Sequence, residues 1–128
     1  MILDSSVIIA ILLKESGFES VLLKIIESDE VSIGSPTLVE CTIVLSARLQ
    51  KDARTLIMRF LQETNISIVP FTQNHYSVAV SAWLNYGKGR HPAALNFGDC
   101  LAYATAKIAN QPLLMKGEDF NKTDIILA

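Results

Sequence analysis

Short apolar runs alternate with longer helix-like runs along the whole of this 128-residue chain. The apolar runs are MIL, EVSIG, ISIV and PLLMK, at residues 1–3, 30–34, 66–69 and 112–116. Such alternation is typical of α/β proteins with a parallel sheet. We predict a three-layer α/β/α fold with a central, mainly parallel sheet of four to five short strands flanked by helices. No linker-like or repeated segment interrupts the pattern, so we expect one domain over residues 1–128.

The segments between these runs have helical spacing of apolar residues. This spacing predicts that the buried faces of two of these helices include Ile26 and Ile43, respectively. Ser35, directly before Pro36, is expected to cap a helix. A last short strand is expected within 117–128. The expected helices cover residues 5–13, 17–28, 37–50, 52–64, 72–87 and 98–110.

Charge and cysteine content restrict the function. The chain has 11 basic and 13 acidic residues and a formal charge of −2, so bulk electrostatics would not hold it on nucleic acid, and such binding needs a local patch or a metal. Cys41 and Cys100 have no zinc-site spacing and indicate a reduced, cytoplasmic protein. The apolar N-terminal stretch is shorter than the roughly 20 residues that span a bilayer, so no membrane association is expected.

Four acidic residues lie among apolar or small residues, at strand ends or near helix starts: Asp4, Glu40, Asp99 and Asp119. Each has an ordinary structural explanation. Asp4 and Asp99 suit helix N-termini, Glu40 suits a partly exposed helix face, and Asp119 suits a turn. The other acids, Glu15 among them, fit polar helix faces or caps.

In a parallel sheet these four acids could meet at one edge, where they would repel one another unless a cation lay among them. Oxygen ligands without His or Cys suit Mg²⁺ or Mn²⁺ better than zinc. Mg²⁺ commonly binds one or two carboxylates together with a substrate phosphate. The four acids therefore indicate phosphodiester chemistry.

The same residues resemble the PIN-domain ribonucleases, and among them the VapC-type toxins of prokaryotic toxin–antitoxin pairs. The resemblance covers essentially the whole chain. It rests on MILDSS with Asp4 and Ser6, SPTLVEC with Glu40, and LNFGDCLAYATA with Asp99. It also rests on PLLMKGEDFNKTDI, which contains Asp119 and, as supporting residues, Thr123 and Asp124. Glu118 stands where the family often has Asn or Asp. We expect it to be an outer-shell acid of the site, beside Asp119.

The resemblance implies a PIN-like fold and a Mg²⁺- or Mn²⁺-dependent endoribonuclease that hydrolyses cellular RNA, such as tRNA or rRNA, and so stops growth. It further implies that Asp4, Glu40, Asp99 and Asp119 are the catalytic and metal-binding residues. A cognate VapB-type antitoxin, whose apolar C-terminal segment covers the active site, and a homodimer are the implied partners.

Basic residues are candidates for RNA contacts. Lys88, Arg90 and His91 lie in a loop just before Asp99, and Lys116 follows the last predicted strand. An ordinary solvated loop explains the first three equally well, and a pairing with Glu118 or solvent would explain Lys116.

Three other functions were weighed. A phosphoacceptor receiver needs paired acids after the first strand and an acceptor Asp after the third, whereas here Asp4 is alone and the third strand runs into Pro70. A haloacid-dehalogenase-like phosphatase needs a second Asp at position 6, which is Ser. A binding-only PIN domain is disfavoured because all four acids are present, and cleavage assays with and without EDTA would separate it from a nuclease.

Overall fold

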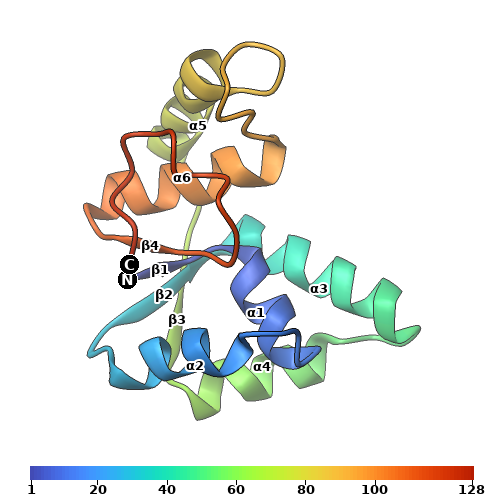
Figure 1. Cartoon of the computed structure of the whole chain (residues 1–128). Helices are drawn as coiled ribbons and strands as arrows, with labels where there is room; N and C mark the ends of the chain where they lie inside the picture. The colour runs from blue at the N-terminus through green and yellow to red at the C-terminus, as the bar shows by residue number, and fades with distance from the viewer.

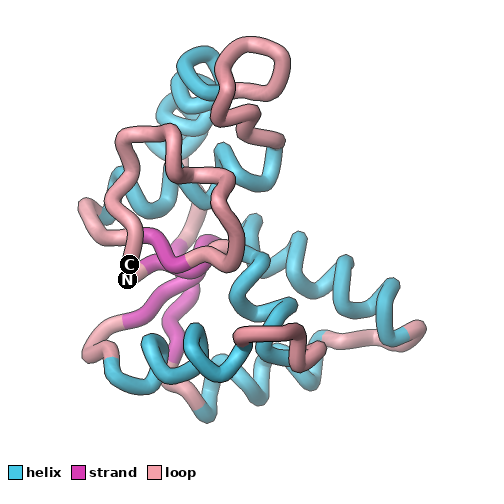
Figure 2. The backbone as a smooth tube through the Cα atoms, viewed as in Figure 1, coloured by secondary structure: helices cyan, strands magenta, loops and turns pink.

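The computed structural model describes all residues from 1 to 128, and it confirms the predicted α/β order. The strands lie in the middle of the molecule with helices on both sides (Figures 1 and 2). The elements follow in the order β1 (Ile2–Leu3), α1 (Ser5–Leu12), α2 (Phe18–Glu27), β2 (Val31–Gly34), α3 (Ser35–Leu49), α4 (Arg54–Glu63), β3 (Ile66–Val69), α5 (Gln73–Tyr86), α6 (Phe97–Ala109) and β4 (Leu113–Leu114).

The sheet has four strands in the order β3-β2-β1-β4, and every pair is parallel. The chain moves from β1 to β2 and β3 on one side and later returns to add β4 on the other side. The point between β1 and β4 is therefore the switch in strand order, where α/β sheets form a crevice beyond the carboxyl ends of their strands.

Both faces of the sheet are covered, as expected for parallel strands. Successive side chains of a strand point to opposite faces. Leu3 and Leu114 accordingly pack into a core with α1 to α4, whereas Ile2 and Leu113 pack into a second core with α5, α6 and the C-terminal segment. Figure 1 shows α5 and α6 on one side of the sheet and α1 to α4 on the other.

Four details of the sequence prediction were wrong. Ile26 and Ile43 are 66% and 64% exposed, because the sheet and the neighbouring helices cover a narrower stripe of α2 and α3 than the apolar spacing suggested. Gly34, rather than Ser35, is the N-cap of α3. The expected last strand is reduced to a single parallel bridge between Leu113 and Leu127.

No helix of the structure has the length and apolar character that crossing a membrane would require.

Candidate active site

The structure brings the four predicted acids together in one cleft beyond the carboxyl ends of β1 and β4. This cleft has a volume of about 570 Å³, and we call it the acid cleft. Its lining comes from α1, α3, α6, the residues that precede α1 and α6, and the segments that follow α1 and β4. The lining residues are Asp4, Ser5, Ser6, Ile9, Glu15, Glu40, Val44, Arg48, Asn96, Asp99, Lys116, Gly117 and Asp119.

Asp4 directly follows β1 and is the N-cap of α1. Its Oδ2 accepts a hydrogen bond of 3.0 Å from the backbone N–H of Ser6, and the residue is only 5% exposed. Burial raises the pKa of Asp4, bonding to Ser6 opposes that rise, and the charge of Asp119 adds to it. From the sequence, capping α1 and facing the cleft were alternative roles for Asp4. In the structure Asp4 does both.

Glu40 reaches the acid cleft because residue 98 is glycine. A Cβ atom added to Gly98 would come within 2.8 Å of Oε1 of Glu40 and would approach Oε2 still more closely. Burial raises the pKa of Glu40, the hydroxyl of Ser5 lowers it, and the charge of Asp4 raises it further. Gly98 thus lets the Glu40 carboxylate lie against the first turn of α6, close to Asp99.

Asp99 lies in the first turn of α6, in a reciprocal cap with Asn96. The Asp99 N–H donates to Oδ1 of Asn96 at 2.9 Å, and the Asn96 N–H donates to Oδ2 of Asp99 at 3.0 Å. The pKa of Asp99 is raised to about 6, mainly by burial. The hydrogen bond from Asn96 lowers it, and the charges of Asp4, Asp119 and Glu40 raise it further. The four acids therefore interact electrostatically as one group.

Asp119 is exposed and lies in the loop after β4. Two contacts fix this loop: the N–H of Lys116 donates to Oγ of Ser6 at 3.0 Å, and Phe120 is 1% exposed in the core. Ser6 thus has a defined role, since it connects the start of α1 to the loop that carries Asp119.

The chemistry of the acid cleft fits a divalent cation. None of the four acids forms an ion pair with a Lys or Arg, so no paired cation of the chain offsets their mutual repulsion. No three His, Cys, Asp or Glu side chains converge tightly enough to hold one ion between them. The arrangement therefore suits an ion bound by one or two carboxylates with waters between it and the others, which is the usual mode for Mg²⁺.

The basic residues Lys88, Arg90 and His91 do not line the acid cleft, and the side chains of Arg90 and His91 pack against α5. The guanidinium of Arg90 lies 4.9 Å over the ring of Trp83, and its Nε donates to the carbonyl of Leu84. His91 packs edge-on against Tyr86. Of the predicted RNA contacts, only Lys116 lines the cleft; Lys88, Arg90 and His91 do not.

Thr123 and Asp124 also lie outside the acid cleft. Thr123 donates to the carbonyl of Phe120 at 2.8 Å. Asp124 accepts hydrogen bonds from the hydroxyl of Tyr103 at 2.6 Å and from Nζ of Lys107 at 2.7 Å. The Asp124 bonds fasten the C-terminal segment to α6, whereas the Thr123 bond lies within that segment, so both residues support the fold around the site without lining the cleft.

Three cleft residues were missed from the sequence. Glu15 was interpreted as a solvated surface acid, and Arg48 was considered as part of an RNA or antitoxin surface but was not linked to the acids. Neither has a local sequence signal, because their positions depend on how α1 and α3 pack. Asn96 was detectable, since an Asn three residues before Asp99 has the spacing of a reciprocal cap.

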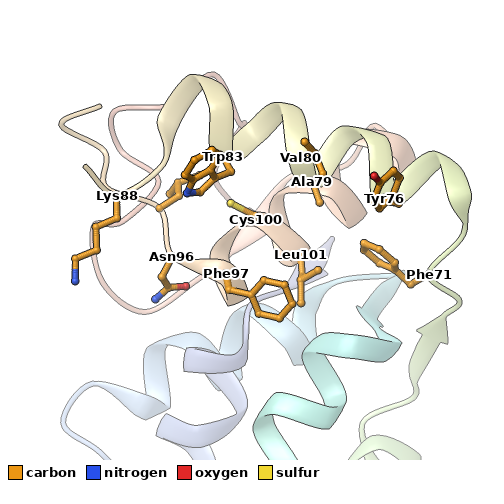
Figure 3. A pocket seen from close by; sticks show the side chains of 11 residues that line it. Phe71, Tyr76, Ala79, Val80, Trp83, Lys88, Asn96, Phe97, Cys100 and Leu101 are labelled. Atoms are coloured by element: carbon orange, nitrogen blue, oxygen red, sulfur yellow. The ribbon is translucent and has the colours of Figure 1, made fainter. Parts of the chain in front are cut away.

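Two apolar grooves flank the acid cleft. The larger, about 710 Å³, is the α5–α6 groove, lined by Phe71, Tyr76, Ala79, Val80, Trp83, Lys88, Leu95, Asn96, Phe97, Cys100 and Leu101. Figure 3 shows the lining side chains of α5 and α6 around this groove, with Lys88 at its edge extending away from it. The α3–α4 groove, about 360 Å³, is lined by Leu38, Val39, Thr42, Ile43, Arg54, Ile57 and Met58. Asn96 borders both the α5–α6 groove and the acid cleft.

Comparison with known proteins decides the family. The family model of the PIN domain matches residues 1–126 of the chain. The chain belongs to the PIN-domain family. Within it, this PIN domain is 43% identical over 126 residues to VapC ribonuclease Mb2004c of Mycobacterium bovis and to ribonuclease VapC36 of Mycobacterium tuberculosis. Each alignment covers 98% of this chain and 91% of the relative, so the PIN domain is of the VapC ribonuclease type.

Solved structures share the fold. VapC20 of Mycobacterium tuberculosis, named as a sarcin–ricin-loop-cleaving toxin, superimposes with a TM-score of 0.78 at 13% identity, covering 99% of this chain and 97% of that one. VapBC2 of Rickettsia felis, bound to a promoter DNA fragment, gives a TM-score of 0.77 at 16% identity. The superposition covers 99% of this chain and 96% of that one. The predicted PIN-like fold is therefore confirmed.

The raised pKa of Asp99 predicts a pH-dependent effect of Asp99→Asn on the metal-free protein. A carboxyl with a pKa of about 6 when folded, above its usual value, binds protons more tightly in the folded state, so its charge destabilises the fold increasingly as pH rises toward 6. Asparagine keeps an acceptor for the Asn96 N–H and carries no charge. We expect roughly 1 kcal/mol of stabilisation above pH 6, discounted because water in the cleft screens part of the repulsion.

Thermal unfolding in EDTA at several pH values measures this effect. The melting temperature of Asp99→Asn should exceed that of the wild type by about 3 °C above pH 6, and the difference should vanish near pH 4. Asp29→Asn, at an exposed acid outside the cleft, should show no such pH dependence. Equal melting temperatures of Asp99→Asn and wild type at every pH would contradict the repulsion.

Proposed function

We propose that this PIN domain is a divalent-metal-dependent endoribonuclease toxin that hydrolyses phosphodiester bonds in cellular RNA. The observation that supports this most is the convergence of Asp4, Glu40, Asp99 and Asp119 in one cleft, where none of them is paired with a Lys or Arg. The VapC ribonucleases among the relatives agree with this activity. We assign the catalytic and metal-binding roles to these four residues.

We propose Mg²⁺ or Mn²⁺ as the bound ion. When bound, it would lower the pKa of a water molecule and offset charge on the scissile phosphate. Asp4, Glu40 and Asp99 would hold it directly or through waters, and Asp119 would complete the shell. The N–H groups of Ser6 and Asn96 orient two of these carboxylates before any ligand arrives.

The chain's cations would contact the substrate. Arg48 lines the acid cleft and forms no ion pair, and Lys116 lies at its rim. A phosphate entering a cleft of acids needs such positive charges beside it, since RNA is itself an anion. We therefore propose Arg48 and Lys116 as contacts to the phosphates that flank the cut. Cleavage of tRNA or rRNA in the cytoplasm would stop growth.

A cognate VapB-type antitoxin is the proposed inhibitor. Helix α3 directs Glu40 and Val44 into the acid cleft, and Val39 and Ile43 into the α3–α4 groove. Solved structures of the same fold include a toxin–antitoxin complex from Klebsiella pneumoniae, with a TM-score of 0.73. An apolar antitoxin segment in this groove would lie beside the acid cleft and could cover it.

A homodimer is also proposed, with the α5–α6 groove as its contact face. Phe97, which is 80% exposed, lies at the edge of a groove of about 710 Å³ on the same face. A projecting ring and a hollow on one surface suit a two-fold interface, in which each copy fills the hollow of the other. The matching face of a second copy would then border both acid clefts through Asn96.

Cleavage of total cellular RNA by the purified protein tests the activity. With Mg²⁺ or Mn²⁺ we expect defined new RNA ends, which EDTA abolishes. Asp4→Asn and Asp99→Asn should reduce the rate by roughly 100-fold or more, because each removes a charge at the reacting group. Asp29→Asn is the control that should cleave normally. A folded Asp99→Asn protein with the wild-type rate and end map would refute the assignment.

Ile43→Asp tests the antitoxin site. Placing a charge in the α3–α4 groove should weaken the complex with a coexpressed VapB-type antitoxin from the same genome by about tenfold or more, since a buried unpaired charge is costly. RNA cleavage by the free variant should remain, because Ile43 does not line the acid cleft. Ile26→Asp, at a similarly exposed residue of α2, is the matched control. Equal antitoxin affinity for Ile43→Asp and the control would argue against this groove.

Phe97→Asp tests the dimer face. An aspartate is compatible with the first turn of α6, but its charge would be buried at the proposed interface. Analytical ultracentrifugation should show a dimer for the wild type and for Ile26→Asp, and a monomer for Phe97→Asp at the same concentration. A Phe97→Asp protein that remains dimeric would place the interface elsewhere.

A further inference from the structure

One ion pair of the molecule lies in the acid cleft. Nζ of Lys116 is 3.8 Å from Oε1 of Glu15, and the two side chains are 32% and 38% exposed. The other ion pairs of the structure are more exposed and lie outside the cleft. Lys116 thus pairs with the cleft acid that is not among the four proposed metal-binding residues.

The backbones of both partners are fixed at opposite ends of α1. Lys14 adopts a left-handed conformation with φ of 52°, the Lys14 N–H donates to the carbonyl of Ile11, and the Glu15 N–H donates to the carbonyl of Ala10. This is a Schellman motif, which turns the chain back at a helix C-terminus. At the other end, Ser6 accepts the bond from the Lys116 N–H. The two long side chains therefore meet along the side of α1 that faces the cleft.

The pair is too long for a hydrogen bond and is partly open to water. An ion pair of this kind contributes little to stability, so a competing anion can replace one partner readily. A phosphate oxygen forms stronger, charge-assisted hydrogen bonds with a lysine ammonium. Lys116 can therefore exchange Glu15 for a phosphate without loss of any buried contact.

We propose that Glu15 is a positioning residue that holds Lys116 at the rim of the acid cleft, and that Lys116 transfers from Glu15 to a backbone phosphate when RNA binds. This proposal rests on RNA being the substrate. Glu15 keeps the Lys116 ammonium away from the four acids. Among those acids, the ammonium would compete with a metal ion. Glu15 also competes with the phosphate, so it lowers RNA affinity while leaving the reacting groups unchanged.

RNA binding tests the proposal separately from cleavage. The probe is a short fluorescein-labelled RNA of mixed sequence, and anisotropy is measured with Mg²⁺ in an Asp99→Asn background so that the strand stays intact. Lys116→Met should weaken binding about fivefold and reduce the slope of log affinity against log salt by about 0.7, as expected for one lost contact to a single strand. Lys116→Arg should retain most of the affinity, since it keeps the charge.

Glu15→Gln should tighten RNA binding by about two- to threefold, because Lys116 no longer has a competing partner. In the Lys116→Met background the same substitution should change nothing. Glu118→Gln is the matched control: it removes the same charge close to Lys116 in the sequence, but Glu118 neither pairs with Lys116 nor lines the cleft.

Two binding results would overturn the proposal. One is that Glu118→Gln increases RNA affinity as much as Glu15→Gln does. The other is that Glu15→Gln still increases RNA affinity in the Lys116→Met background. In cleavage assays with Asp99 intact, Lys116→Met should raise KM with kcat retained, and a fall in kcat at unchanged KM would also overturn it. If binding follows the expected pattern but no variant cleaves RNA, the proposed nuclease function fails while the Lys116–phosphate contact stands.

Discussion

Repulsion among the carboxylates of Asp4, Glu40 and Asp99 is the constraint on which the site depends. Burial raises the pKa of each, and the charge of at least one other acid of the cleft raises it further, yet the fold sustains this unfavourable arrangement. It can do so because the acids belong to rigid elements. Asp4 follows a fully buried strand, and Asp99 lies in the first turn of α6, the helix with the most buried residues. Strain of this kind at a preorganised site is the usual cost of function in a stable scaffold.

Helix α3 links the site to its surroundings. Its inner side supplies Glu40, Val44 and Arg48 to the acid cleft, while Val39 and Ile43 remain exposed along the adjoining α3–α4 groove. A ligand in the groove and a ligand in the cleft would therefore contact the same rigid helix on neighbouring sides. No conformational change is needed for one to obstruct the other.

The parts that the sequence predicted well are those with a local physical signal. Short apolar runs flanked by helices identified β1 to β4, and acids at strand ends or helix starts identified the residues that meet in the cleft. The errors arose where tertiary packing decides. Ile43 has the periodicity of a core residue but faces a groove, and Arg90 is close to Asp99 in sequence but lies on Trp83. Glu15 reaches the cleft only because the chain turns back after α1.

The caps of α1 and α6 also limit how the two buried aspartates can bind an ion. Each uses its Oδ2 to accept a backbone N–H, from Ser6 in one case and from Asn96 in the other. The bond holds each carboxylate in a defined orientation before any ion arrives. Calcium favours roughly six to eight oxygens, often from bidentate carboxylates, whereas magnesium retains waters and accepts single oxygens in a strict octahedron. If the proposed ion binds in the acid cleft, two helix caps, ordinary devices of protein stability, would also set how these carboxylates can ligate it.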